Sequence, residues 1–228
     1  MSIQRALVIG ARGGVGKATA DALIAAGAQV LAAGRERDAT DPKQVEALFD
    51  EADPDLVVVA AGTRPQMASI EEQTWESFSA PWDVDVRIAF EVGRAALARP
   101  LRRGSTVLIV SSGAGLHGSP LSGGYAGAKR TQMFVAQYLQ RAGDARELGI
   151  RFVALAPRQL LAGTAIGAAA AAAYGAAAGV SPEAYMKRQN EVPLDAAGVA
   201  RAIVAIASGE QHPQATLLSV TADGVEEI

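Results

Sequence analysis

Short apolar segments alternate with helical ones along this chain of 228 residues, and this alternation restricts the folds that it can adopt. Most of the apolar segments are rich in Val, Leu or Ile without polar alternation, as expected of buried parallel strands; they span residues 6–9, 30–33, 56–60, 107–110, 152–155 and 217–220. Helical patterns lie between them, at residues 16–26, 42–52, 82–98, 125–146 and 196–208. We therefore predict one α/β domain over residues 1–228, a doubly wound parallel β-sheet flanked by helices.

Two segments depart from this alternation. Between Arg35 and Asp41 the chain is too short for the helix and strand that a doubly wound half usually contains there. Residues 163–179 are nearly all Ala and Gly, which favour a helix with little side-chain surface for packing. We expect a mobile substrate lid over residues 158–192; a small-residue helix packed closely against a neighbour would have the same composition.

The composition excludes several kinds of site. The chain has no cysteine, which removes disulfides, Cys-ligated zinc and thiol nucleophiles. Its two histidines, His117 and His212, are far apart, so we predict no metal site. The net charge of −3 and the short apolar runs predict neither a nucleic-acid partner nor a membrane span. The first strand follows Met1 without a signal-peptide pattern, so we expect a soluble, cytoplasmic protein.

A glycine-rich turn connects the first predicted strand to the first helix, with the spacing G-x-x-x-G-x-G. Glycines at such a turn adopt unusual backbone angles, let the main chain approach a phosphate and let the helix pack against the strand. The first N–H groups of the helix would then face a pyrophosphate. We predict that this turn binds a dinucleotide through Gly10, Arg12, Gly14, Val15 and Gly16; a tight turn without a ligand is the alternative.

The residues after the second strand bear on the choice of dinucleotide. A site that prefers NAD usually has a carboxylate here for the adenosine ribose hydroxyls, and Gly34 has no side chain. Arg35 and Arg12 would instead bind a 2′-phosphate by charge-assisted hydrogen bonds. We predict that NADP(H) is preferred over NAD(H); the alternative is a pair of solvated surface arginines.

Ser112, Tyr125 and Lys129 have the chemistry and the spacing of a proton-transfer site. Tyr125 and Lys129 are four residues apart, one turn along one face of a helix. Ser112 follows the strand 107–110, at the edge of the sheet where ligands bind. A phenol needs a nearby cation to act as an acid or base near neutral pH, and Lys129 would provide it. Ser112 would hydrogen-bond the reacting oxygen; a helix-face Tyr beside an exposed Lys is the alternative.

These motifs resemble those of the short-chain dehydrogenase/reductase family over essentially the full length of the chain. The matching residues are Gly10, Gly14, Gly16, Ala60-Ala61-Gly62, Ser112, Tyr125, Lys129 and Pro157. The resemblance implies a Rossmann-type fold, an NAD(P)(H) cofactor and the interconversion of alcohols and ketones. It also implies cofactor contacts for Asp38 near adenine, Lys129 and Tyr125 near the nicotinamide ribose, Thr164 near the carboxamide, and Ala61, Gly62 and Pro157.

Three positions differ from the family pattern. Ala60 stands where the family usually has an asparagine, and Arg158 stands where a glycine usually follows the proline. Asp85 aligns with the family's fourth catalytic residue, an asparagine that positions a water in a proton relay. A carboxylate accepts hydrogen bonds but does not donate in the same way, so Asp85 is a candidate catalytic residue with an altered role.

The leading functional hypothesis is an NADPH-dependent reductase of a small or medium carbonyl compound, or the reverse alcohol oxidation. A non-catalytic NADP-binding sensor or regulatory protein of the same fold is the second hypothesis. A sugar-nucleotide epimerase or dehydratase is the third, although those enzymes usually have a larger segment after the position of Pro157. By the same resemblance we expect a homodimer or homotetramer that pairs through the helices predicted at 82–98 and 125–146.

Overall fold

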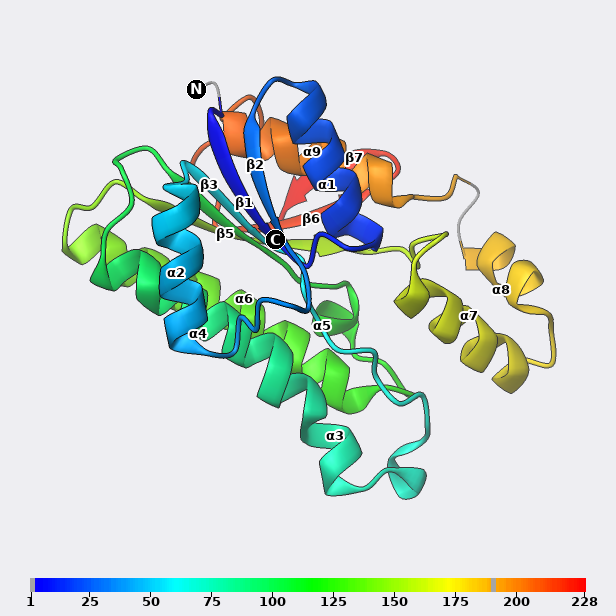
Figure 1. Cartoon of the computed structure of the whole chain (residues 1–228). Helices are drawn as coiled ribbons and strands as arrows, with labels where there is room; N and C mark the ends of the chain where they lie inside the picture. The colour runs from blue at the N-terminus through cyan, green and yellow to red at the C-terminus, as the bar shows by residue number, and fades with distance from the viewer. Residues whose placement is uncertain (1–2, 190–191) are drawn as a thin grey trace.

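The computed structural model describes residues 3–189 and 192–228 (Figure 1). Within these residues one sheet has the order β2-β1-β3-β4-β5-β6-β7. Its strands are β1 (Arg5–Ile9), β2 (Gln29–Ala33), β3 (Leu56–Val59), β4 (Thr106–Val110), β5 (Arg151–Pro157), β6 (Leu217–Thr221) and β7 (Gly224–Glu227). Strands β1 to β6 are parallel, and β7 runs antiparallel to β6. The six predicted strands are confirmed; β7 was not predicted, because it is short, mostly exposed and charged.

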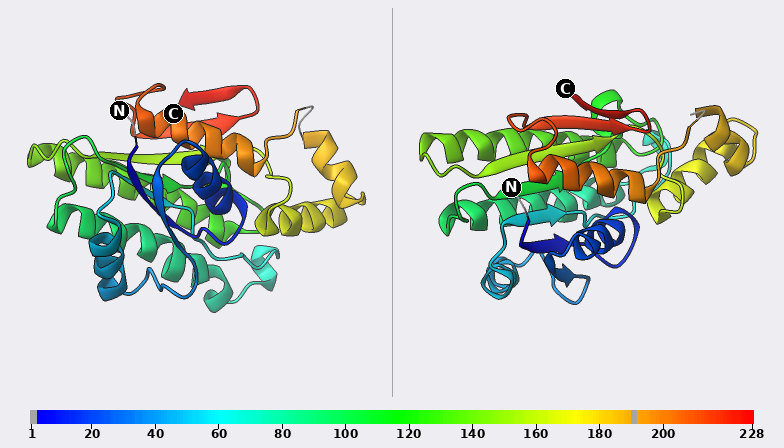
Figure 2. Two further views of the ribbon diagram at one scale, coloured as in Figure 1. Left: turned by 45° about the horizontal axis from the view of Figure 1, so that its top comes forward. Right: turned by 90° about the horizontal axis from the view of Figure 1, so that it is seen from above.

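Helices cover both faces of the sheet. On one face lie α1 (Gly14–Ala25) and α9 (Ala196–Ser208); on the other lie α2 (Pro42–Ala52), α4 (Arg87–Ala98) and α6 (Gly123–Ala145) (Figures 1 and 2). In β1, Ala6 and Val8 pack on the first face, whereas Leu7 and Ile9 pack on the second. Full burial of a Leu or Ile side chain contributes about 1.5–3 kcal/mol to folding, which explains the uninterrupted apolar strands.

β2 is at the edge of the described sheet, because the segment between Arg35 and Asp41 is too short to add a further helix and strand there. β1 pairs with β2 on one side and with β3 on the other, so the strand order reverses between β1 and β3. Open α/β sheets bind ligands beyond the carboxyl ends of their strands at such a reversal. The glycine turn after β1 and the Ala60–Gly62 segment after β3 both lie at this point.

The helix predicted at residues 82–98 begins earlier than expected. α3 (Trp75–Pro81), a π-helical turn η2 (Trp82–Val86) and α4 follow one another without a break, after a 3₁₀ turn η1 (Ile70–Glu72). Pro81 has no backbone N–H to continue the α-helical hydrogen bonds, and the wider π turn follows it directly. The buried Asp85 lies within this turn, so the irregular segment is the one that places a candidate site residue.

The segment expected to form a lid is a helical hairpin at one side of the molecule (Figure 2). The Ala- and Gly-rich residues form α7 (Ala165–Ala177), and α8 (Pro182–Gln189) follows it; the rings of Tyr174 and Tyr185 stack between them. Residues 190–191 of the predicted lid lie outside the described residues. No single described helix has the length and apolarity to cross a membrane, although α7 and α8 together, bent by 98°, pass that test by length and composition.

Candidate active site

The glycine turn after β1 is tightly packed against the segment after β3. Gly10 has a φ of +92°, and a side chain on it would place Cβ 2.6 Å from the Cα of Ala61. A Cβ on Gly16 would lie 2.7 Å from the carbonyl carbon of Gly10. These two positions therefore require glycine, and they bring Ala61 and Gly62 to the edge of the turn as the family resemblance implies.

The N-terminus of α1 has the features of a phosphate site. Among the described residues no side chain caps it, because Gly13 is the N-cap residue, and its first turn carries no acidic residue. A Cβ at Gly13 would meet no atom within 4 Å, so its surroundings are open. Backbone N–H groups without an internal acceptor attract an anion, and the helix dipole favours negative charge here. The residues present thus fit a dinucleotide pyrophosphate, with Val15 in the first helical turn.

A carboxylate does lie at the end of β2, contrary to the expectation drawn from Gly34. Glu36 reaches back over the turn, where its Oε1 accepts a 2.8 Å hydrogen bond from the backbone N–H of Gly34. Its other oxygen forms an ion pair with Arg12. Hydrogen bonds from backbone N–H groups, together with Arg12, lower the pKa of Glu36 below its usual value. Arg12 is thus paired with a carboxylate, whereas Arg35 is exposed.

Asp38 is part of a local turn. Its Oδ1 accepts hydrogen bonds from the hydroxyl of Thr40 at 2.7 Å and from the Thr40 backbone N–H at 2.9 Å. These bonds, followed by the charge of Arg87, lower the pKa of Asp38. The Asp38 side chain is exposed, and the residue lies two positions after Glu36 in the sequence. Its contact with adenine stays a prediction.

Lys129 lies inside the protein, with 4% of its surface exposed. Its Nζ donates hydrogen bonds to Gln132 Oε1 at 3.0 Å and to the carbonyl of Val110 at 3.3 Å, and it lies 3.1 Å from Asp85 Oδ2. The same nitrogen is 5.3 Å from the centroid of the Tyr125 ring. The predicted Tyr125–Lys129 pair therefore shares one buried site with Asp85, at the carboxyl end of β4.

Opposing effects act on the amine of Lys129. Burial alone would lower the pKa of Lys129, because a buried cation loses its hydration. The negative charge of Asp85, and then that of Tyr125, act in the opposite direction, and the pKa of Lys129 is raised above its usual value. The site accordingly holds a positive charge next to Tyr125.

Asp85 is fully buried, with 0% of its surface exposed, and only one of its two carboxylate oxygens accepts a hydrogen bond. Oδ1 accepts a 2.6 Å hydrogen bond from the backbone N–H of Thr63, and Oδ2 faces Lys129. A Cβ at Gly62 would lie 2.9 Å from Oδ2, so the glycine leaves room for the carboxylate. The amide of Gln132 donates to the Asp85 carbonyl at 2.9 Å. Gln132 was not predicted as a site residue. Its position three residues after Lys129, on the same face of the helix, would have indicated it.

The ends of β4 and β5 lie together around Ser112. The N–H of Gly113 donates to the carbonyl of Pro157 at 2.7 Å, and the hydroxyl of Ser111 donates to the Lys129 carbonyl at 2.8 Å. Ser112 Oγ accepts a 3.2 Å hydrogen bond from the N–H of Ala114. Ser112 and Pro157 are therefore on the edge that carries Lys129. A hydrogen bond between Ser112 and a reacting oxygen stays a prediction.

Thr164 lies next to the glycine turn. Its Cγ2 would be 3.5 Å from a Cβ on Gly14, and its hydroxyl caps α7 by accepting from the N–H of Gly167 at 3.0 Å. The same hydroxyl donates to the carbonyl of Leu161 at 2.9 Å. The beginning of the α7–α8 hairpin is thereby close to the predicted pyrophosphate site.

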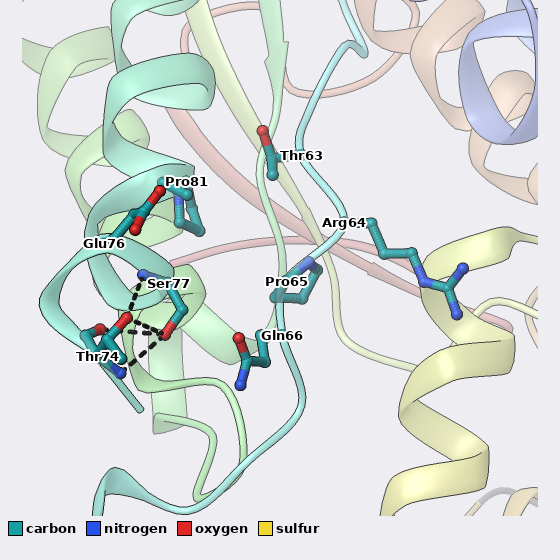
Figure 3. A pocket seen from close by; sticks show the side chains of 9 residues that line it. Thr63, Arg64, Pro65, Gln66, Thr74, Glu76, Ser77 and Pro81 are labelled. Carbon is teal, nitrogen blue, oxygen red and sulfur yellow. Dashed lines mark hydrogen bonds between the residues drawn. The ribbon is translucent and has the colours of Figure 1, made fainter. Parts of the chain in front are cut away.

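A pocket of about 370 Å³ opens beyond β3 (Figure 3). One wall is the segment that begins at Thr63, whose N–H donates to Asp85. The other wall is α3, with Ser77 and Pro81, and its N-cap residue Thr74. In Figure 3, Arg64 points away from the α3 wall. Thr63 therefore lines the pocket and also contacts the Asp85–Lys129 pair through Asp85. Among the described residues no group of three or more His, Asp or Glu side chains is arranged to hold a metal ion.

Residues 33–213 match the family model described as enoyl-(acyl carrier protein) reductase, which covers most of the chain. The chain belongs to the short-chain dehydrogenase/reductase family. The match includes Asp38, Asp85 and the Ser112, Tyr125 and Lys129 set, and it ends beyond the α7–α8 hairpin.

A similar protein agrees with the assignment of this chain to the family. A protein of Sinorhizobium fredii, an uncharacterised short-chain type dehydrogenase/reductase, is 32% identical over 142 residues, 54% of this chain and 57% of that protein. The matched part thus spans little more than half of that relative.

Solved structures of several dehydrogenases and reductases have the same fold. Sorbitol-6-phosphate 2-dehydrogenase from Erwinia amylovora is 23% identical, with a TM-score of 0.82 over 95% of this chain and 97% of that one. A Burkholderia cenocepacia short-chain dehydrogenase in complex with NADP has 20% identity and a TM-score of 0.74 over 96% and 95%. The Brucella melitensis 3-ketoacyl-(acyl-carrier-protein) reductase complexed with NADH has 19% identity and a TM-score of 0.74 over 96% of each chain.

Proposed function

We propose that this protein reduces a small or medium carbonyl compound to an alcohol, or catalyses the reverse oxidation, with Tyr125 as the proton-transfer group. The observation that carries the proposal is the buried pair of Tyr125 and Lys129, with Nζ 5.3 Å from the ring, at the sheet edge that also holds the glycine turn. A non-catalytic sensor would not need a buried cation beside a tyrosine, because nucleotide binding alone requires only the turn and the helix N-terminus.

Each residue has a distinct role in the proposed reaction. Tyr125 donates its hydroxyl proton to the carbonyl oxygen in reduction and accepts it back in oxidation. Lys129 favours this transfer through its charge and, as the family resemblance implies, would also hold the nicotinamide ribose. Ser112 donates a hydrogen bond to the same oxygen and stabilises developing negative charge. The nicotinamide, when bound, supplies or accepts the hydride.

We propose that NADP(H) is preferred over NAD(H), by means of Arg12 and Arg35. Arg12 is paired with Glu36, but both side chains are substantially exposed, at 68% and 49%. Water screens an exposed ion pair of this kind, so a 2′-phosphate dianion competes well for the guanidinium. Arg35 is exposed on the same turn and adds a second charge. Glu36 is the feature that opposes this preference, since a carboxylate at this edge also accepts from ribose hydroxyls.

A screen of uncharged ketones and aldehydes tests the proposed function. The purified protein is incubated with NADPH or NADH, and the loss of absorbance of the reduced cofactor is followed. We expect turnover with at least one carbonyl compound and a lower KM for NADPH than for NADH. Cofactor binding without turnover across the screen would instead favour the sensor. We retain the cytoplasmic location as a prediction.

A further inference from the structure

Tyr174 is the one residue of α7 with a polar side chain, because every other residue of that helix is Ala, Gly or Ile. It follows Ala170 and Ala171 by four and three residues, and both of these are buried. Residues at this spacing share a helix face, so Tyr174 extends from the face of α7 that packs against the protein. Its hydroxyl is therefore the side-chain group through which hydrogen bonds can hold this alanine-rich helix in one orientation.

The hydroxyl of Tyr174 reaches a turn that directly precedes α6. In this turn, residues 119–122, the N–H of Ser122 donates to the carbonyl of Ser119 at 3.2 Å. Tyr174 forms a hydrogen bond with Ser119 Oγ and accepts a second one, at 3.4 Å, from the backbone N–H of Leu121. Ser119 Oγ lies 2.6 Å from Ser122 Oγ. A chain of hydroxyl groups thus connects the α7–α8 hairpin to the residue three positions before Tyr125.

Ser122 forms this connection in place of an ordinary helix cap. It is the N-cap residue of α6, where a serine hydroxyl usually accepts a hydrogen bond from the first helical turn. Its side chain makes no capping bond, and only 5% of the residue is exposed. A buried hydroxyl without a partner is costly, and the bond with Ser119 provides the partner. The start of the helix that carries Tyr125 is therefore tied to the hairpin.

The 119–122 turn is also joined to the wall of the pocket beyond β3. The N–H of Ala68 donates to the carbonyl of Leu121 at 2.8 Å, and Ala68 lies two residues after Gln66, which lines that pocket. The turn thus has hydrogen bonds to the segment that forms the pocket wall and to α7. The hairpin moves away from the turn only when the hydroxyl of Tyr174 loses its partners there.

We propose that Tyr174 is a positioning residue: its hydroxyl holds the α7–α8 hairpin against the 119–122 turn and so determines the shape of the space in which a carbonyl substrate lies beside Tyr125. A substrate then binds to a protein whose hairpin is already in place. The effect on substrate binding rests on the proposed function, whereas the attachment of the hairpin does not require turnover.

Amide hydrogen exchange in the cofactor-free protein measures this attachment. Tyr174→Phe removes the hydroxyl and keeps the ring that stacks on Tyr185. We expect exchange to be about 2–10-fold faster in α7 and at the amides of Ser122 and Ala126, the usual effect of one neutral hydrogen bond. Tyr185→Phe is the matched control, because it changes the other ring of the same stack. Its hydroxyl makes no hydrogen bond among the described residues, so exchange in both segments should stay as in the wild type.

Ser119→Ala removes the other end of the same hydrogen bond and is expected to accelerate exchange in α7 as well. Tyr174→Phe should then add much less in the Ser119→Ala background than in the wild type, because the two changes act on one bond. Exchange in Tyr174→Phe that equals exchange in Tyr185→Phe would overturn the proposal. Faster exchange in α7 without a change at Ser122 and Ala126 would overturn it too, because the hairpin would then not be tied to the start of α6.

The kinetics of a carbonyl compound that the wild type reduces test the positioning role. In Tyr174→Phe we expect its KM to rise, by no more than the fold-change in exchange, because a smaller fraction of the protein holds the hairpin in place. We expect kcat to stay close to that of the wild type, since bound substrate selects the attached form. An unchanged KM would overturn the positioning role. A wild type that reduces no carbonyl compound would refute the proposed function, while the exchange experiment would still decide whether Tyr174 holds the hairpin.

Discussion

The end of β2 is the part of the site that was predicted least well from the sequence; it comprises Gly34, Glu36 and the paired Arg12. The absence of a side chain at Gly34 indicated an absent carboxylate, but the backbone turns so that Glu36, two residues later, returns to the same place. The spacing of residues in the sequence does not predict where the carboxylate of a flexible side chain lies in the folded protein. Gln132 was missed for a similar reason, because its importance comes from contacts with another helix, at Asp85.

Glu36 is expected to weaken NADPH binding, because it holds the guanidinium of Arg12 and would repel a 2′-phosphate. Glu36→Gln should therefore lower the Kd for NADPH several-fold and raise that for NADH, since the amide accepts ribose hydroxyls less well than a carboxylate. Both constants are measured by titration of tryptophan fluorescence. Glu51→Gln, which removes a carboxylate paired with Arg37 instead, is the control. An unchanged ratio of the two constants would contradict this role for Glu36.

At the scale of elements, regular patterns were predicted well and irregular ones were not. The bounds of α2 and α9 agree with the prediction, because each has an Asp N-cap and an apolar face. α3 was not predicted, because Pro81 obscures the helical pattern. Residues 82–86 were predicted as part of a helix, but their π form was not, since a π turn has no sequence signature. The composition of residues 163–179 did not predict where α7 begins and ends, or that it packs against α8. A run of alanines has no pattern of large apolar side chains that would indicate a packed face.

The N-cap of α7 links the predicted lid to the cofactor site. Thr164→Ala removes the hydroxyl that caps this helix and should cost it about 1 kcal/mol, seen as faster amide hydrogen exchange in residues 165–170. Ser181→Ala, which removes a comparable bond at the start of α8, should leave those amides unaffected. If the hairpin is a lid, NADPH should slow exchange in α7 of the wild type; exchange that is indifferent to NADPH would contradict the lid.

At the scale of the whole molecule, the parallel sheet and the strand reversal between β1 and β3 bring distant motifs to one edge. The glycine turn, residues 60–62, Asp85 and the Tyr125–Lys129 pair are separated in sequence but meet there, as alternating strand and helix patterns predict. The order of motifs along the chain was therefore enough to predict that these residues lie at one edge of the sheet. The charge pairing within the site was not predictable, because it depends on side-chain packing between elements.

The outer faces of α4 and α6 carry large apolar side chains that a partner subunit would cover. Phe90, Phe134 and Tyr138 are 51%, 60% and 63% exposed, and the rings of the last two stack 6.0 Å apart. We expect a homodimer or homotetramer in light scattering at micromolar concentration, and dissociation in Phe134→Arg. Ile24→Arg, at an exposed site on α1 on the opposite face of the sheet, should leave the assembly intact. A monomeric wild type would contradict the expectation.

We propose above all that Tyr125 transfers the proton and that the positive charge of the buried Lys129 favours this transfer. The direct measurement is the rate of carbonyl reduction by Tyr125→Phe, with NADPH affinity and thermal unfolding measured on the same preparation. We predict that the variant folds and binds NADPH like the wild type, while kcat falls by about 100-fold or more, the usual loss when a general acid is removed. Undiminished reduction by this variant would contradict the account.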